Sequence, residues 1–188
     1  MKQLLISLRA LIILSILTGV IYPVLITVIG KVVFPAQANG SILTVRGRAV
    51  GSSLIGQSFA DPKYFHSRPS ASSYDASNSG GSNFALTNQK LLDQVTQRIQ
   101  QIRSDNNLSA TTPIPPDLVF ASASGLDPHI SVDAAMLQVP RVATARHLTA
   151  EQVTQFVRQY TEPPFVGIFG EPVVNVLQLN LALDALVK

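Results

Sequence analysis

The stretch SGGSN, residues 79–83, has the composition of a loop that could wrap a phosphate group. Two adjacent glycines allow positive φ and can leave backbone N–H groups free, while the hydroxyl groups of Ser79 and Ser82 add further donors. The same glycine pair is equally typical of a plain turn. The residue types leave two interpretations: a phosphate site at Ser79, Gly80, Gly81, Ser82 and Asn83, or a structural loop.

A second glycine-containing stretch, GSSLIGQS at 51–58, has the GxxxxG spacing of a P-loop followed by Ser58. Gln57 occupies the position where that motif needs lysine, so no local ammonium group balances the terminal phosphates. No acidic strand that could hold Mg²⁺ follows it. We therefore interpret residues 51–58 as a strand and a turn.

Residues that usually bind metals or act as nucleophiles are sparse in this chain. His66, His129 and His147 lack the HxxxH and HExxH spacings that direct two imidazoles to one metal, and there is no cysteine. Neither the GxSxG elbow nor the SxxK motif of serine hydrolases is present. We expect no metal site, no catalytic residue, and ordinary surface or turn positions for the histidines.

Two arginines in the last third of the chain, Arg141 and Arg146, have Asp127 and Asp133 as the nearest acidic residues before them. Groups of this kind are more often structural ion pairs than sites for an anion. We expect the four residues to form a structural ion-pair set.

The charge of the chain argues against nucleic acid as a partner. It carries 14 lysines and arginines against 11 acidic residues. Lys2 and Arg9 precede the apolar segment described next, so 12 basic residues face 11 acidic ones in the remainder, a balance of +1. That remainder has no dense basic stripe.

With 188 residues, we expect one ordinary core plus an appendage.

The appendage is an uncharged segment from Ala10 to Ile29, long enough as a helix to cross a hydrocarbon core of about 30 Å. A cleaved signal peptide is the alternative, with AQA at 36–38 as its cleavage site, but the apolar run is too long and AQA lies too far beyond it. Lys2 and Arg9 before the span favour a cytoplasmic N-terminus. We therefore predict a single-pass protein of the cell membrane with a cytoplasmic segment 1–9, a transmembrane helix 10–30 and an extracytoplasmic domain 31–188.

Small residues recur every fourth position within this span, at Ser15, Gly19, Pro23 and Thr27. They share one helix face, which would let another membrane helix approach closely. The alternative is a lone anchor whose small residues face lipid. In either case we expect Pro23 to kink the helix.

The domain after the span reads as a mixture of short strands and amphipathic helices, which predicts a small α+β domain. A long polar loop at 66–88 is expected to cover the core. Capping residues mark helix starts at Thr87 or Asn88, at Ser131 and at the TAEQ capping box. The predicted strands are 42–45, 52–59 and a buried strand at 118–122. The predicted helices are 88 to about 102, 132–138, 140–146, one after 149–152, and one within 173–187. Pro140 is expected to interrupt the helix that begins at 132, and residues 177–183 of the last helix also alternate like a strand.

Several motifs together resemble one family. GSSLIGQSF, PKYFHSRPSASSYDASNSGGSN, SGLDPHIS, RVATAR and VNVLQLNLALD occur in that order behind a single N-terminal span. In this the chain resembles the C subunit of Kdp-type potassium-transporting ATPases over essentially its whole length. The resemblance implies an accessory subunit, not itself an enzyme, of a high-affinity potassium uptake complex, with a potassium-conducting subunit, a P-type ATPase subunit and the lipid bilayer as partners.

The resemblance also implies specific residues. The family is described as a catalytic chaperone that raises the affinity of the ATPase subunit for ATP, which assigns nucleotide contact to Ser79, Gly80, Gly81, Ser82 and Asn83. It implies no tightly bound cofactor, with ATP as a possible ligand through the complex. The remaining family motifs imply a structural or interface role for Gly125, Leu126, Asp127, Pro128, His129, Arg141 and Arg146.

The predicted topology conflicts with the chaperone role, because a domain outside the cytoplasm would not meet ATP at useful concentration. We therefore favour assembly and stabilisation of the complex as the physical role. A membrane-anchored sensor or ligand-binding module that acts alone is the alternative from another class. An anchored enzyme would require a cluster of perturbed titratable groups, which the sequence does not indicate.

Overall fold

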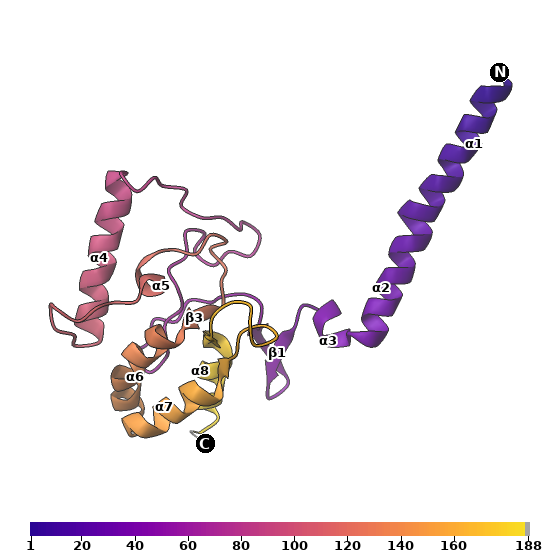
Figure 1. Ribbon diagram of the computed structural model, residues 1–188. Coiled ribbons are helices and arrows are strands. Elements are labelled where there is room, and N and C mark those ends of the chain that lie inside the picture. The colour runs from indigo at the N-terminus through magenta and orange to yellow at the C-terminus, as the bar shows by residue number, and fades with distance from the viewer. Residues whose placement is uncertain (187–188) are drawn as a thin grey trace. The chain divides into compact units, whose positions relative to one another are not determined.

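The computed structural model describes residues 1–186 and divides the chain into two compact units, the first Met1–Ser52 and the second beginning at Ser53 (Figure 1). The second unit is a mixture of helices and short strands. The predicted α+β class, with one apolar N-terminal helix, is therefore confirmed.

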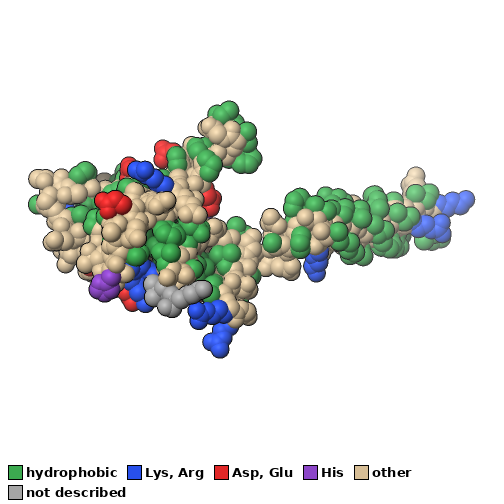
Figure 2. Space-filling model, turned by 90° about the horizontal axis from the view of Figure 1, so that it is seen from below, with side chains coloured by type: hydrophobic (Ala, Val, Ile, Leu, Met, Phe, Trp, Pro, Cys, Tyr) green, Lys and Arg blue, Asp and Glu red, His purple; other side chains and the backbone are tan. Residues whose placement is uncertain are grey.

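The first unit begins with a long apolar helix. Helices α1 (Lys2–Ile16) and α2 (Tyr22–Val33) are joined by a π-helical turn, η1 (Leu17–Ile21). The continuous segment of 32 residues is long and apolar enough to cross a membrane, and none of it is buried. Figure 2 shows hydrophobic side chains along this segment, with basic side chains near its ends. The predicted span 10–30 lies inside it, and the helix extends beyond both predicted ends.

The π-helical turn lies where Pro23 was expected to kink the helix. Proline has no N–H to donate to the residue four positions earlier, which is Gly19, and its ring clashes with the carbonyl there. A wider π turn just before the proline relieves that clash. Thr27 Oγ1 donates to Pro23 O at 2.7 Å, so its hydroxyl is used within its own helix.

A short helix, α3 (Pro35–Ala38), and a β-hairpin complete the first unit. Strands β1 (Ile42–Val45) and β2 (Arg48–Ser52) pair antiparallel around Arg46 and Gly47, whose φ values are 51° and 76°. Two consecutive positive φ values are typical of a type I′ hairpin turn. The prediction of a second strand at 52–59 was therefore wrong: the tight turn returns the chain immediately, and the strand ends at Ser52.

The second unit is built on a three-stranded antiparallel sheet in the order β3-β5-β4. The strands are β3 (His129–Ser131), β5 (Val173–Asn175) and β4 (Thr161–Glu162). Ile130 and Val174 on this sheet are buried. The helices of this unit are α4 (Gln89–Asp105), α5 (Pro116–Val119), α6 (Val132–Arg146), α7 (Ala150–Gln159) and α8 (Val176–Asp184).

The predicted helix starts are confirmed by their caps. Asn88 accepts from Lys90 N, Ser131 accepts from Ala134 N, and Thr149 forms a capping box with Gln152. These signals are local and do not depend on the rest of the fold. The sequence of helix α4 places Leu91, Leu92, Val95, Ile99 and Ile102 on one apolar side, but only Leu91 of these is buried and Leu92 is exposed.

Helix α6 corrects the prediction that Pro140 interrupts it. The helix continues from Val132 to Arg146 with Pro140 inside and exposed. Val139, Val142 and Ala143 are buried in the core beside the proline. Their burial offsets the backbone hydrogen bond that Pro140 cannot make, which propensity alone would not predict.

The secondary structure of two further segments was predicted wrongly. Residues 118–122 do not form a strand: Leu118 and Val119 are buried as expected, but they belong to the short helix α5, which begins at Pro116. The C-terminal segment is not helical throughout, since β5 occupies Val173–Asn175 before α8 begins. The part of that predicted helix beyond residue 186 lies outside the described residues.

Candidate functional site

Two of the family-like motifs, distant in the sequence, pack against each other. The backbone N–H of Gly80 donates to Ser124 O at 2.8 Å, and Ser79 Oγ donates to the same carbonyl at 3.0 Å. Ser70 Oγ donates to Gly125 O at 2.6 Å. The SGGSN loop is therefore tied to the segment 123–125, and the N–H of Gly80 is not free for a ligand.

Gly125 is the position that this contact constrains most. Its φ of +68° lies in the left-handed region, and an added Cβ would overlap Ser72 Oγ and lie 2.8 Å from Gly80 O. Gly81 also lies close to the opposing segment, since its Cβ would be 3.0 Å from Ala123 O. Only glycine fits at 125, because other residues would meet both strain and a clash.

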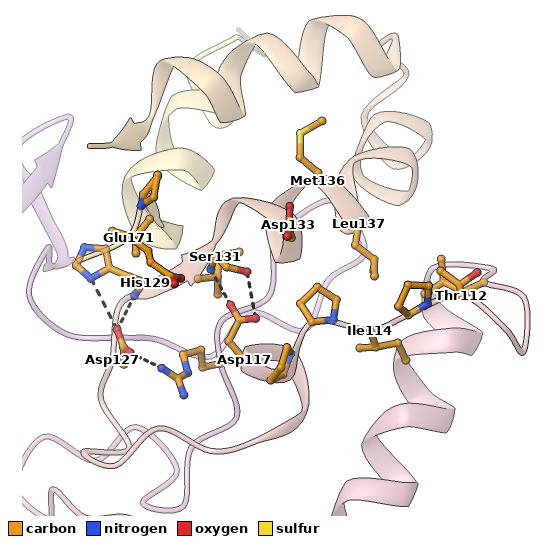
Figure 3. A pocket seen from close by; sticks show the side chains of 18 of the residues that line it. Thr112, Ile114, Asp117, Asp127, His129, Ser131, Asp133, Met136, Leu137 and Glu171 are labelled. Carbon is orange, nitrogen blue, oxygen red and sulfur yellow. Dashed lines mark hydrogen bonds and ion pairs between the residues drawn. The ribbon is translucent and has the colours of Figure 1, made fainter. Parts of the chain in front are cut away.

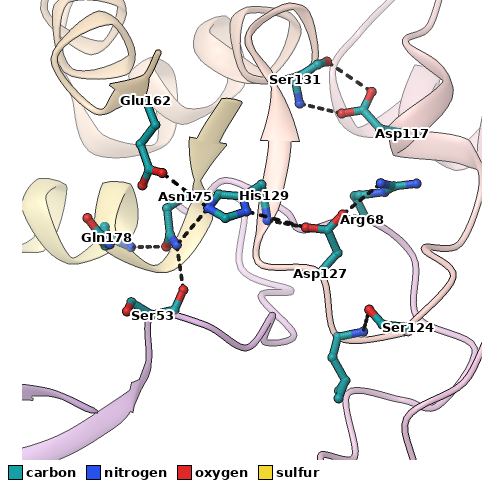
Figure 4. A network of polar contacts seen from close by, with 11 residues as sticks. Ser53, Arg68, Asp117, Ser124, Asp127, His129, Ser131, Glu162, Asn175 and Gln178 are labelled. Atoms are coloured by element: carbon teal, nitrogen blue, oxygen red, sulfur yellow. Dashed lines mark hydrogen bonds and ion pairs between the residues drawn. The ribbon is translucent and has the colours of Figure 1, made fainter. Parts of the chain in front are cut away.

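Asp127, two residues after Gly125 in the chain, is the centre of a polar network (Figure 4). Its carboxylate pairs with Arg68 at 2.9 Å and accepts from the backbone N–H of His129 at 2.9 Å. His129 Nδ1 lies 3.7 Å from Asp127, and its Nε2 lies 3.7 Å from Glu162. The side chains thereby connect β3, β4 and the loop around Arg68.

Asn175 extends the network to the end of the sheet. Its Nδ2 donates to Ser53 O at 2.8 Å, and its Oδ1 accepts from Gln178 N at 3.2 Å, which caps α8 (Figure 4). The N–H of Gly56 donates to Leu126 O at 2.8 Å, and Val176 N donates to Pro128 O at 3.0 Å. The SGLDPHIS motif is therefore a structural junction of several segments.

An open groove of about 960 Å³ lies beside Asp127 and His129 (Figure 3). One wall is the proline-rich stretch 112–116, and another is the part of α6 that carries Met136 and Leu137. Four carboxylates line it, of which Asp117 accepts from Ser131 N at 2.6 Å and Asp127 pairs with Arg68. The other two carboxylates are those of Asp133 and Glu171. The groove is thus largely apolar with an acidic margin.

A smaller hollow of about 390 Å³ lies next to the SGGSN loop. Gly81 and Ser82 line it together with Arg98 of α4. Arg98 Nη1 donates to Val119 O at 2.9 Å, and burial lowers the pKa of this guanidinium. A guanidinium beside a serine and a glycine can hold an anion.

Arg141 and Arg146 do not pair with Asp127 and Asp133, so the predicted ion-pair set was wrong. Arg141 donates to the carbonyl oxygens of Pro62 and Tyr64, and Arg146 donates to Lys63 O at 2.7 Å. Arg146 also forms an ion pair with Asp184 at 2.8 Å, while Asp127 pairs with Arg68. Both arginines hold residues 62–64 against α6. Their guanidinium groups supply hydrogen bonds to carbonyl oxygens that are not paired in a strand.

Two buried side-chain amides, those of Asn180 and Gln138, hold the backbone of Phe65 and His66. Neither amide was identified from the sequence. Asn180 accepts from Phe65 N at 2.8 Å and donates to Phe65 O at 2.9 Å. Gln138 accepts from His66 N at 2.8 Å and donates to His66 O at 3.3 Å. The only signal in the sequence was an amide on the apolar face of each helix.

The three histidines differ more than predicted. His66 is half-buried, and burial followed by the nearby positive charge of Arg141 lowers the pKa of its imidazole. His129 lies in β3 within the Asp127 network, and His147 is the exposed left-handed cap of α6. Within residues 1–186, no three His, Cys, Asp or Glu side chains gather as a metal site would require.

These features define a class: a small α+β protein with one helix suited to anchoring in a membrane and with open grooves beside a hydrogen-bonded loop junction. The model of the KdpC family, described as "K+-transporting ATPase, c chain", matches residues 4–185, and the chain belongs to this family. The resemblance drawn from the sequence motifs is therefore confirmed.

Curated relatives match over nearly the whole chain, and each is named potassium-transporting ATPase KdpC subunit. The protein of Dechloromonas aromatica is 54% identical over 183 residues, covering 94% of both chains. The protein of Ralstonia nicotianae is 54% identical over 92% of this chain and 86% of its own length. The protein of Mycobacterium tuberculosis (strain H37Rv) is 48% identical over 98% of this chain and 99% of its own.

Proposed function

We propose that this chain is a non-catalytic accessory subunit of a high-affinity, ATP-driven potassium import complex. It stabilises the assembly of the potassium-conducting subunit and the P-type ATPase subunit. The observation that carries this proposal is the helical segment Lys2–Val33, of which no residue is buried within the chain. So long an apolar surface needs lipid as its cover, and its face of small residues would let a neighbouring helix pack closely. The names of the relatives support the proposal.

We assign the N-terminal residues 1–9 to the cytoplasm and the second unit to the outer side of the cell membrane. The support is the excess of basic residues, Lys2 and Arg9, before the helix. A reporter fused after Lys188 tests this orientation, since an enzyme that is active only outside the cytoplasm should be active there. Activity of a cytoplasmic reporter at the same position would reverse the assignment.

The small-residue face of the helix gives the sharpest test of assembly. Gly19→Phe should reduce copurification of the two larger subunits in mild detergent, because a large ring would keep another helix away from this face. Leu25→Phe is the matched control, since Leu25 lies about 200° around an ideal helix from both Pro23 and Thr27. Equal loss in both variants, or in neither, would contradict a role for this face.

Copurification also separates the subunit from the alternative of a sensor or ligand-binding module that acts alone. Extracted from its native membrane, an accessory subunit should elute with larger hydrophobic chains. A module that acts alone should elute by itself, which would overturn the assembly role.

Nucleotide contact at Ser79, Gly80, Gly81, Ser82 and Asn83 is a second candidate function. What favours it is the hollow that Gly81 and Ser82 share with Arg98. Titration of ATP into the full chain tests it: Ser82→Ala and Arg98→Gln should weaken binding, whereas Ser77→Ala outside the hollow should not. Affinity that is unchanged in both hollow variants would remove this site.

A further inference from the structure

The loop between β4 and β5 carries an exposed apolar cluster. Its tip, residues 163–170, reads PPFVGIFG and contains no charged or hydrogen-bonding side chain. Four large side chains are exposed there: Phe165 at 76%, Val166 at 72%, Ile168 at 77% and Phe169 at 67%. Single exposed hydrophobic residues are ordinary, but four within five positions are not.

Most backbone N–H groups of this apolar tip, residues 163–170, are hydrogen-bonded within the tip itself. Phe165 N donates to Phe169 O at 2.9 Å, and Phe169 N donates back to Phe165 O at 3.0 Å. Gly167 N donates to Pro164 O at 2.8 Å and Ile168 N to Phe165 O at 3.2 Å, while both prolines lack an N–H. Four of the six backbone N–H groups in the tip are thus paired internally, which lowers the cost of moving this segment from water into lipid.

The apolar tip is better suited to contact lipid than the groove is, because the groove is lined by carboxylates and the tip is not. Burying phenylalanine, valine and isoleucine side chains at the boundary of headgroups and acyl chains requires no desolvation of charge. Glu162 and Glu171 border the tip on either side, so insertion should not need anionic lipid. This differs from interfacial segments that rely on lysine and arginine.

The chain also tethers the second unit, which carries the apolar tip, to the N-terminal helix. If Lys2–Val33 spans the membrane as proposed above, only residues 34–52 separate the spanning helix from the second unit. A tether of this kind makes the second contact intramolecular, so even weak insertion is populated. A loop whose affinity is too low to bind vesicles by itself would then still insert when it is tethered to the spanning helix.

We propose that the apolar tip, residues 163–170, inserts into the interface of the same bilayer that holds the N-terminal helix. The second unit thereby gains a second membrane contact, which restricts its rotation about the linker. This inference rests on the proposed membrane span but needs neither partner subunit, and it holds for either orientation of the chain.

The chain has no tryptophan, so one introduced indole is a unique fluorescent reporter. The full chain carrying Phe169→Trp is reconstituted into phosphatidylcholine vesicles with or without acyl-chain bromines. We expect a blue-shifted emission and at least about a twofold quenching by the brominated lipid. Leu86→Trp is the matched control, because Leu86 is 81% exposed but lies outside the tip, and its emission should be unquenched.

A charge in the apolar tip should abolish the effect. Adding Phe165→Asp to the Phe169→Trp chain should remove the quenching, with Ile168→Asp as a second variant should the first fail to fold by circular dichroism. Flotation with the vesicles reports separately on the spanning helix, so loss of the anchor is distinguished from loss of tip insertion. Equal quenching of the indoles at 86 and 169, or protection of the tip that arises only when partner subunits are added, would overturn the proposal.

Discussion

Asp127 accepts a charge-assisted hydrogen bond from Arg68 at 2.9 Å and joins two loops that lie 59 residues apart in the chain. The same carboxylate holds the N–H of His129 at the start of β3. One side chain therefore helps to hold both the loop around Arg68 and the start of the sheet. Removing the carboxylate of Asp127 should change one margin of the groove and leave the packing of the hydrophobic core unchanged.

Asp127→Asn should lower the free energy of unfolding by about 1–3 kcal/mol, because Arg68 loses its charged partner and the amide is a weaker acceptor. The midpoint of urea unfolding of the detergent-solubilised chain, followed by tyrosine fluorescence, measures the change. Glu171→Gln removes another carboxylate of the same groove and should change the free energy of unfolding by less than about 0.5 kcal/mol. Equal effects would contradict the special role of Asp127.

Gly125→Ala should destabilise the second unit by more than about 2 kcal/mol, since strain at φ +68° is added to a clash with Ser72 and Gly80. Gly167→Ala separates the two causes. Gly167 has a φ of +74° with nothing within 4 Å of an added Cβ, so this variant should show only the strain of about 1 kcal/mol. Similar midpoints for both variants would show that the loops do not pack as described.

Asn180→Leu should cost about 2–4 kcal/mol, because the buried N–H and C=O of Phe65 would both lose their partner. Gln178→Leu on the same helix is the control, since only the backbone of Gln178 takes part in the cap of α8. The unfolding midpoints of the two variants test this, and a nearly neutral Asn180→Leu would mean that residues 65–66 are held by other contacts.

His66 should make stability depend on pH. Burial and the charge of Arg141 lower its pKa in the folded chain, whereas the unfolded value is near 6.5. The unfolded chain therefore binds the proton more readily, so the stabilisation is complete above about pH 6.5 and is lost as pH falls toward the folded value. Urea midpoints at pH 7.5 and 5.5 should differ less in His66→Gln than in the unchanged chain, with His147→Asn as the exposed control. An identical pH dependence in His66→Gln would exclude His66 as the cause.

The local part of the fold was predictable from the sequence. Asn88, Ser131 and Thr149 cap helices where their types indicated, because a cap is decided within three residues. The apolar run that forms α1 and α2 was also recognisable, since its length and lack of charge need no tertiary contact. Of the candidate site, the family-like motifs could be named, but not the way they meet.

What only the tertiary structure decided are the contacts between distant segments. The pairing of β3 with β5, the contact of Arg68 with Asp127 and the hydrogen bonds of Asn180 to Phe65 join residues that are 42 to 115 positions apart. Strands of three residues carry too little pattern to be recognised, and α6 continues through Pro140 because its buried face offsets the missing hydrogen bond. Side-chain types and spacing determine what a segment can do alone, whereas burial and long-range partners exist only once the chain has folded.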